Sequence, residues 1–246
     1  MKKLLIVVNS AKFFISHRLP LAVEAQKSGF ETEVAFPEDL QVHKDLIESN
    51  DLTIRLISLS RAGKKSFKEF YSFCSLLRTV LRAKPDLIHL ITIKPVLYVG
   101  LITRFLNIPT LIAISGMGYM YKKDGNKFLR MLTDSVYRII LSNKNLKIVV
   151  QNNNDKKVIK SIKDLNESDI SLLPGSGVNL KEFKFSTPNL QQKTFLMPCR
   201  MLWDKGVREF VDAAKKIKDK YPEINFILSG PYEDQNPGKV PKEYLN

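Results

Sequence analysis

Cysteine is scarce in this chain of 246 residues. The two cysteines, Cys74 and Cys199, lie far apart and show neither a CxxC motif nor the cysteine–histidine spacing of a metal site. Disulfide-stabilised domains and structural zinc sites need more cysteines at closer spacing. The sequence therefore favours a protein of the reducing cytosol.

Several catalytic motifs are absent as well. The three histidines form no HxxxH pair, and no DxD follows a predicted strand. There is no GxSxG elbow, no GxxxxGK[ST] phosphate loop, and no GxGxxG after the first strand. These absences exclude serine hydrolases, P-loop NTPases and metal-dependent sugar transferases. They also argue against a nicotinamide or flavin site, so we predict no metal and no cofactor.

The chain has no long, uninterrupted hydrophobic run. Its most apolar region, Pro95–Met120, is broken by Arg104, Asn107 and Pro109 and does not fit a membrane span. The first apolar run, Leu4–Val8, is too short for the hydrophobic region of a signal peptide. We therefore expect a cytoplasmic protein.

Basic residues outnumber acidic ones, 39 to 25, which gives a formal net charge of +14. Such an excess favours an anionic partner, because long-range electrostatic attraction concentrates anions near the protein. Nucleic acid, an acidic membrane surface and phosphate-bearing substrates all meet this description. The charge alone does not choose among them.

Short apolar runs alternate with segments of helical period. The predicted strands are Leu4–Val8, Thr32–Phe36, Thr53–Leu59, Asp86–Ile91, Thr110–Ile114, Leu146–Val150 and Asp169–Leu173. The predicted helices are Arg18–Ser28, Leu40–Ser49, Phe67–Ala83, Val96–Leu106, Asn126–Ser142 and Asn154–Ile162. This alternation is typical of right-handed βαβ units. We predict an α/β fold with a doubly wound, Rossmann-like parallel sheet.

A polar stretch, STPNLQQ at residues 186–192, is predicted to link two domains. Residues 1–185 would form the first domain and residues 193–246 the beginning of a second Rossmann-like domain. The second region is predicted to hold a strand, a helix and a strand: Lys193–Cys199, Val207–Lys220 and Ile224–Ser229. Two strands are few for a parallel-sheet domain, so this second domain is expected to be incomplete.

The turn within Met197–Phe210 is the clearest candidate site. Arg200 and Lys205 flank it, and a helix is predicted to begin near Gly206. The free N–H groups at a helix N-terminus attract anions, and two nearby cations suit a diphosphate. The alternative is a solvated arginine and lysine on an ordinary strand–helix connection.

Residues just past the other predicted strands supply further candidates, because open parallel sheets bind ligands at the carboxyl ends of strands. Lys12, His17 and Arg18 follow the first strand and can contact anions or hydroxyls. The alternative is a helix-start loop packed over apolar residues. Lys94 is predicted to lie in a loop at the rim of the sheet. A lone histidine in a strand, such as His89, is more often a hydrogen-bonded core residue than a catalyst.

The segment after the fifth predicted strand contains Gly116 and Gly118, which permit a close backbone approach to a ligand. Aromatic and basic side chains follow: Tyr119, Tyr121, Lys122 and Lys123. This mixture, continued by the basic amphipathic segment Asn126–Ser142, suits the surface of an anionic membrane. The alternative for the helix is that it buries its apolar stripe on the sheet.

Six stretches, taken in order, resemble the retaining GT-B glycosyltransferases (glycosyltransferase family 4-like). They are FFISHRLPLA from Phe13, HLITIKPVLYVG from His89, SGMGYMY from Ser115, VVQNNND from Val149, PGSGVNLKEF from Pro174 and RMLWDKGVREF from Arg200. The first three are similar to the subset that acts on undecaprenyl-diphosphate-linked oligosaccharides. The resemblance covers the whole chain.

The resemblance implies two facing Rossmann-like domains, with the acceptor on the first and the nucleotide-sugar on the second. Arg200 and Lys205 match the pair that binds the donor diphosphate. In the family this pair stabilises the departing nucleoside diphosphate, a role that a metal ion has in other transferases. The residues implied for the cleft and the acceptor loops are Arg18, Lys94, Gly116, Gly118, Asn152 and Gly177. His17 and His89 are the candidates for the catalytic base.

One departure from the family pattern concerns the end of the chain. Such enzymes continue to a Glu-rich loop that binds the donor's sugar and ribose, whereas Gly230–Asn246 carries no strand–loop–helix for it. We expect the chain to be truncated and to show weak or no turnover by itself.

The leading hypothesis is a glycosyltransferase that moves a hexose or N-acetylhexosamine from a UDP-sugar to a polyprenol-diphosphate-linked sugar. It would work peripherally on the inner face of a bacterial plasma membrane, in surface polysaccharide or glycan assembly. One alternative is a sugar-nucleotide epimerase or hydrolase of the same fold. Another is a non-catalytic basic module for membranes or nucleic acid, although the basic residues are spread over every predicted helix and form no single stripe.

Overall fold

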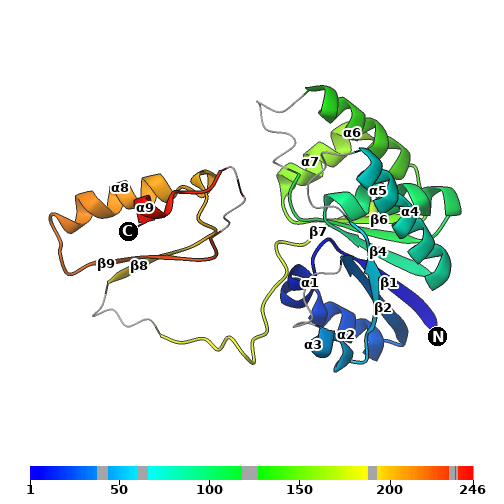
Figure 1. Cartoon of the computed structure of the whole chain (residues 1–246), viewed down its shortest axis with the longest axis horizontal. Helices are drawn as coiled ribbons and strands as arrows, with labels where there is room; N and C mark the ends of the chain where they lie inside the picture. Colours follow the sequence, from blue (N-terminus) through cyan, green and yellow to red (C-terminus); the bar gives the residue numbers. More distant parts are fainter. Residues whose placement is uncertain are drawn as a thin grey trace. The chain divides into compact units, whose positions relative to one another are not determined.

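The computed structural model describes residues 1–37, 44–59, 66–117, 127–187, 193–232, 236 and 238–245. The chain divides into two compact units, Met1–Gly177 and Val178–Asn246. In the first unit, a seven-stranded parallel sheet lies between two layers of helices (Figure 1). The predicted α/β class is therefore confirmed.

The strands of the first unit are β1 (Lys2–Val7), β2 (Phe30–Pro37), β3 (Thr53–Ile57), β4 (Leu87–Ile91), β5 (Thr110–Ile114), β6 (Leu146–Val150) and β7 (Ile170–Leu172). Its helices are α1 (Ala11–His17), α2 (Leu19–Lys27), α3 (Lys44–Glu48), α4 (Ser66–Ala83), α5 (Ile93–Leu106), α6 (Lys127–Ile140) and α7 (Asn153–Ile162), with a short 3-10 helix η2 (Glu167–Asp169). The strand order is β3-β2-β1-β4-β5-β6-β7, and all neighbouring strands run parallel.

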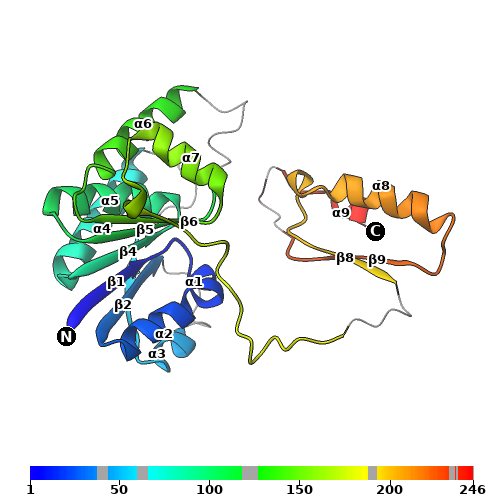
Figure 2. The same ribbon diagram turned by 180° about the vertical axis from the view of Figure 1, so that it is seen from behind.

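Side chains alternate between the two faces of this sheet. Leu5 and Val7 of β1 pack into one hydrophobic cluster, together with residues of α4–α7. Leu4 and Ile6 pack into a second cluster with residues of α1–α3. Figures 1 and 2 show these two groups of helices on opposite faces of the sheet. Strands buried on both faces are almost continuously apolar, which explains why the sequence pattern revealed them.

Two loop predictions were wrong, one because an additional helix was missed and one because a predicted helix begins earlier. Residues 9–18, predicted as a loop, contain α1, and the Phe13 N–H donates a 3.4 Å hydrogen bond to Ser10 Oγ as the helix cap. Helix α5 starts at Ile93 and not at Val96. Lys94 therefore belongs to the first turn of a helix and not to a rim loop.

The second unit contains β8 (Thr194–Pro198), the 3-10 helix η3 (Trp203–Lys205), α8 (Val207–Lys218), β9 (Asn225–Ser229) and α9 (Lys242–Leu245). Strands β8 and β9 pair in parallel, and α8 lies along one face of the pair (Figure 1). The predicted strand–helix–strand order is confirmed, whereas α9 was not predicted. Phe226 of β9 packs against Phe210 of α8 and stacks on Phe195 of β8, which ties the helix to both strands.

Gly230, directly after β9, lets the backbone pass close to the end of β8. Its φ is 152°, and a Cβ at this position would lie 1.9 Å from the carbonyl oxygen of Cys199. The following chain is bonded to the same turn. Met201 N–H donates to Pro231 O at 3.2 Å, and Val240 N–H donates to Met201 O at 3.0 Å. These contacts fix the backbone on either side of Arg200.

The connection between the units is described in part. Residues 178–187 form no helix or strand, and residues 188–192 lie outside the described ranges. The predicted domain ranges, 1–185 and 193–246, stay predictions. Among the described residues, no helix is both long and apolar enough to cross a bilayer.

Candidate functional site

The carboxyl ends of the first unit's parallel strands meet at one edge of the sheet. Strand β1 stands between β2 and β4, so the connections that leave β1 and β4 run to opposite faces. Open parallel sheets bind ligands at such a switch point, outside the carboxyl ends of the strands. The candidate residues after β1 and β4 therefore occupy a position that suits a ligand.

Arg18 forms the joint between α1 and α2, because it is the cap residue of both helices. Its Nη1 donates hydrogen bonds to Ser176 Oγ at 3.2 Å and to the His17 carbonyl oxygen at 3.3 Å. Its Nε has no hydrogen-bond partner among the described residues. Burial lowers the pKa of Arg18, yet an arginine remains charged near neutral pH. The joint thus presents a partly buried cation.

The two predicted catalytic histidines have different environments. His17 is exposed at the end of α1, where its ring stacks on Phe13 with centroids 4.5 Å apart. His89 lies within β4 and is 4% exposed. Burial and, after it, the charge of Arg18 lower the pKa of His89 to about 3, although a hydrogen bond with the Leu111 backbone acts in the opposite direction. His89 is therefore neutral at neutral pH, and its Nδ1 has no partner among the described residues.

Thr92 follows β4 directly and is the N-cap of α5. Its φ of 71° and ψ of 159° lie in a region that is normally occupied only by glycine. Its side chain makes no capping hydrogen bond, and its Oγ1 is buried without a partner among the described residues. Backbone strain of this kind collects at functional sites. Thr92 was not among the predicted site residues, and no sequence signal marks its unusual conformation.

Lys94, in the first turn of α5, is paired with a carboxylate. Its Nζ lies 2.8 Å from Glu69 Oε1 of α4, and the Tyr98 hydroxyl donates to the other oxygen of the same carboxylate. Burial raises the pKa of Glu69, but the hydrogen bonds from Lys94 and Tyr98 outweigh it, so the pKa is lowered overall. Glu69 was not predicted, because its partner lies 25 residues further along the chain.

Gly116 and Asn152 lie at the ends of β5 and β6, and Asp155 connects the two segments. Asp155 is 4% exposed; its Oδ1 accepts from the Met117 N–H at 3.0 Å and its Oδ2 from Asn152 Nδ2 at 2.8 Å. In return, Asn152 Oδ1 accepts from the Asp155 N–H at 2.8 Å and caps α7. Gly116 has a φ of 129°. Asp155 therefore holds Met117, the residue after Gly116, against the amino end of α7.

Replacing Asp155 with alanine is expected to lower the free energy of unfolding of the first unit by about 2 kcal/mol, because the buried Met117 N–H loses its acceptor. Thermal unfolding, with hydrogen exchange at Met117, measures the effect. The control Asp155→Asn keeps one carbonyl oxygen at this position and should cost less. Equal stability of the alanine variant and the wild type would contradict the anchoring role.

Gly177 belongs to the loop that follows β7 and has a φ of 71°. Gly175, two residues earlier, has a φ of 90°, and neither glycine has any atom within 4 Å of an ideal Cβ position. The loop is thus exposed, and Ser176 between the two glycines reaches Arg18. The fold of the first unit thus brings Arg18 into contact with this loop. The sequence did not predict this contact.

In the second unit, Arg200 and Lys205 lie in one turn between β8 and α8. Arg200 follows β8, Lys205 ends η3, and both side chains are exposed. Gly206, with a φ of 83°, is the N-cap of the 12-residue helix α8. Both cations thus belong to the connection that leads to the amino end of α8. Anion binding by them stays a prediction. Arg208 lies over the Trp203 ring, 4.7 Å from its centroid, and braces the same turn.

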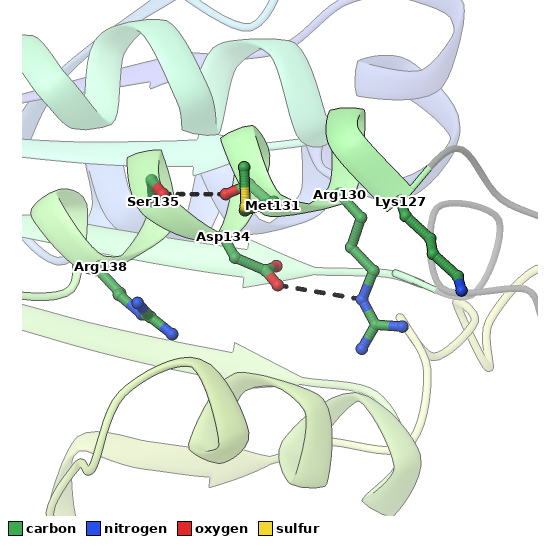
Figure 3. A pocket seen from close by; sticks show the side chains of 6 residues that line it. All are labelled: Lys127, Arg130, Met131, Asp134, Ser135 and Arg138. Carbon is green, nitrogen blue, oxygen red and sulfur yellow. Dashed lines mark hydrogen bonds and ion pairs between the residues drawn. The ribbon is translucent and has the colours of Figure 1, made fainter.

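Helix α6 confirms the predicted amphipathic helix and buries Tyr137 and Ile140 in the core. Its outer side carries a shallow pocket of about 220 Å³, lined by Lys127, Arg130, Met131, Asp134, Ser135 and Arg138 (Figure 3). Lys127, Arg130, Asp134 and Arg138 project from one side of the helix (Figure 3). Phe128, Met131 and Leu132 are 70%, 60% and 53% exposed. The helix therefore packs on the core and also presents apolar and basic side chains to solvent. The predicted contact with an anionic membrane stays a prediction.

Some predicted residues lie outside the described ranges. These are Gly118, Tyr119, Tyr121, Lys122 and Lys123. Their predicted contacts with the cleft and with a membrane stay predictions.

Comparison with protein families finds a match over residues 3–164 to the model described as "Glycosyl transferase 4-like". A curated relative from Campylobacter jejuni is 27% identical over 257 residues, which cover 95% of this chain and 66% of the relative. It is named N,N'-diacetylbacillosaminyl-diphospho-undecaprenol alpha-1,3-N-acetylgalactosaminyltransferase. The chain thus spans just under two thirds of this relative's length.

Solved structures of low identity share the fold. A sucrose-phosphate synthase from Thermosynechococcus elongatus has a TM-score of 0.69 at 12% identity, over 97% of this chain and 65% of that one. MnaA from S. aureus, solved with UDP, has a TM-score of 0.62 at 13% identity, over 97% and 64%. A glycosyltransferase from Rickettsia africae has a TM-score of 0.60 at 15% identity, over 93% and 68%. These likenesses confirm the predicted GT-B type of α/β architecture.

Proposed function

The chain belongs to the glycosyl transferase 4-like family, and from this membership we propose that it is part of a lipid-linked sugar transferase. The reaction would move a hexose or N-acetylhexosamine from a UDP-sugar to a polyprenol-diphosphate-linked saccharide. The observation that carries the proposal is the Arg200–Lys205 turn at the amino end of α8. The Campylobacter relative, named for transfer to a diphospho-undecaprenol acceptor, supports the choice of acceptor.

In this proposal, Arg200 and Lys205 bind the donor diphosphate. As the glycosidic bond to the nucleotide breaks, negative charge develops on the leaving diphosphate, and two cations stabilise it. The exposed N–H groups of the first turn of α8 add to the same effect. Transfer of this kind needs no metal at the diphosphate and would proceed with retention at the anomeric carbon.

The acceptor would lie at the carboxyl edge of the first unit's sheet. Arg18, Lys94, Gly116, Asn152 and Gly177 are the described residues proposed to border it. His17 is exposed at this edge and can exchange a proton with a bound hydroxyl. His89 remains the second candidate for the catalytic base, although its burial keeps it from solvent.

We also place the protein at the cytoplasmic face of the plasma membrane, bound peripherally. A lipid-linked acceptor requires this proximity. The exposed apolar residues of α6, beside Lys127 and Arg130, support a surface for anionic lipid.

The decisive experiment is transfer of a radiolabelled N-acetylhexosamine from its UDP-sugar to a detergent-solubilised polyprenol-diphosphate saccharide. We expect product that depends on the acceptor, and a loss of about tenfold or more when Arg200 and Lys205 are both changed to alanine, since charged hydrogen bonds contribute about 1.5–3 kcal/mol. The control Lys215→Ala and Lys218→Ala removes two exposed lysines from the far end of α8.

The alternative, an epimerase or hydrolase, rests on the UDP-N-acetylglucosamine 2-epimerases among the structural neighbours. Conversion of the UDP-sugar without acceptor and without detergent would support it and contradict the transferase. Unchanged transfer by the Arg200 and Lys205 double variant would contradict the assigned donor site.

A further inference from the structure

The chain that follows β9 returns to the turn between β8 and α8. Residues 238–245, the returning segment, pair with this turn through their backbone. The Trp203 N–H donates to the Gly238 carbonyl oxygen at 3.0 Å, and Lys239 forms an antiparallel bridge with Leu202. Such pairing restricts the backbone of both partners, as a neighbouring strand would. The returning segment therefore holds the middle of the turn in place.

Leu202 links this pairing to both cations of the turn. Its N–H donates to the Arg200 carbonyl oxygen at 2.7 Å, and its own carbonyl oxygen accepts from the Lys205 N–H at 3.0 Å. Leu202 is 3% exposed, so it is anchored by burial as well as by the bridge to Lys239. The backbone positions of Arg200 and Lys205 therefore depend on a residue that the returning segment holds.

The Trp203 side chain adds a second connection between the turn and the returning segment. Its ring meets the Tyr244 ring edge to face, with centroids 4.9 Å apart and an angle of 70° between the planes. The Arg208 guanidinium, in the first turn of α8, lies 4.7 Å from the centroid of the Trp203 ring. Aromatic pairs and cation–π contacts both favour particular geometries. Trp203 thus joins the turn to the returning segment and to the amino end of α8.

The contact between Trp203 and Tyr244 is separate from the aromatic cluster that ties α8 to the strands. That cluster consists of Phe195, Phe210 and Phe226. Among the ring contacts of the described residues, none joins it to Trp203 or Tyr244. Both of these rings are partly buried. Loss of the Tyr244 ring should therefore loosen the turn and leave β8, β9 and α8 packed together.

We propose that the returning segment orders the Arg200–Lys205 turn for its ligand, and that Tyr244 is a positioning residue for these two cations. A turn that becomes ordered only when an anion binds loses part of its affinity, whereas a turn ordered beforehand keeps it. The ligand is the diphosphate of a nucleotide-sugar, and this identity rests on the proposed function. Tyr244 acts through Trp203 and does not touch the ligand.

UDP, titrated into the whole chain by calorimetry, tests the effect on the ligand. We expect Tyr244→Ala to weaken UDP binding about fivefold, because the turn then has to be ordered on binding. Tyr244→Phe keeps the ring that meets Trp203 and should restore the wild-type affinity. The matched control is Tyr221→Ala, which removes a 53% exposed tyrosine beyond the far end of α8 and should leave UDP binding unchanged.

Hydrogen exchange in the absence of ligand separates positioning from general support of the second unit. In Tyr244→Ala, we expect faster exchange in peptides that cover residues 199–206 and unchanged exchange in β8 and β9. Unchanged exchange in the turn would overturn the proposal, as would faster exchange in both strands or a wild-type UDP affinity. If the wild type itself binds no UDP, the proposed donor site is contradicted, and exchange in the turn alone decides whether Tyr244 orders it.

Discussion

Replacing Gly230 with alanine is expected to unfold the second unit. The added Cβ would lie 1.9 Å from the carbonyl oxygen of Cys199, and a backbone atom cannot move aside as a flexible side chain can. The φ of 152° is also unfavourable for any residue with a side chain. We expect a loss of more than about 3 kcal/mol, which exceeds what two strands and a helix can spare.

Fluorescence of Trp203 measures this effect selectively, because it is the chain's single tryptophan and lies in the second unit. The matched control is Gly238→Ala in the same unit, where an added Cβ meets nothing closer than 3.5 Å. A Gly230→Ala protein with a native Trp203 signal and native urea sensitivity would show that the close approach to Cys199 is dispensable. UDP-sugar binding should be lost together with the Trp203 signal, because the same turn carries Arg200.

Acidification from pH 7 to pH 4.5 is expected to lower the free energy of unfolding of the first unit by about 2.5 kcal/mol through His89 alone. The folded-state pKa is about 3, below the ordinary value of 6.5, because the ring is buried. A histidine whose pKa is lowered by folding stabilises the folded state fully only at pH values above its unfolded pKa. As the pH falls below 6.5, the unfolded chain binds a proton that the folded chain excludes, and stability declines at about 1.4 kcal/mol per pH unit.

Hydrogen exchange in peptides from β4 and β1, followed across this pH range, reports on the first unit. In the His89→Gln variant, the free energy of unfolding should decline less over this pH range, by the contribution of about 2.5 kcal/mol that His89 makes in the wild type. The carboxylates with lowered pKa values, such as Glu33 and Glu69, lose their contribution only as the pH falls through and below their ordinary value of 4.5. A parallel decline in His89→Gln and wild type would show that His89 does not control the acid sensitivity.

Much of the fold could be predicted from sequence, because the central strands are buried on both faces. Runs such as those of β5 and β6 are short, apolar and β-branched, and such runs stand out against polar helices. Helix α1 was missed because it has only seven residues, too few for a clear period. The Ser10 cap was the available signal for its start.

Sequence position indicated candidates for the site only through the rule that ligands bind past the ends of parallel strands. Arg200 follows soon after β8, whereas helix α1 separates Arg18 from the end of β1. Glu69 and the anchoring role of Asp155 depend on partners 25 and 38 residues away, which no local pattern encodes. The strained φ of Thr92 is likewise set by tertiary packing, because a threonine has no local preference for it.

The strand order also bears on how the first unit can form during synthesis. Strand β1 leaves the ribosome first; β2 then adds to one side of it and β3 to the outer edge of β2. Strand β4 adds to the free side of β1, and β5, β6 and β7 extend that edge in turn. No strand has to be inserted between two that are already paired. The sheet can therefore grow outward from β1 in the order of translation, which limits the time that any unpaired edge waits for its partner.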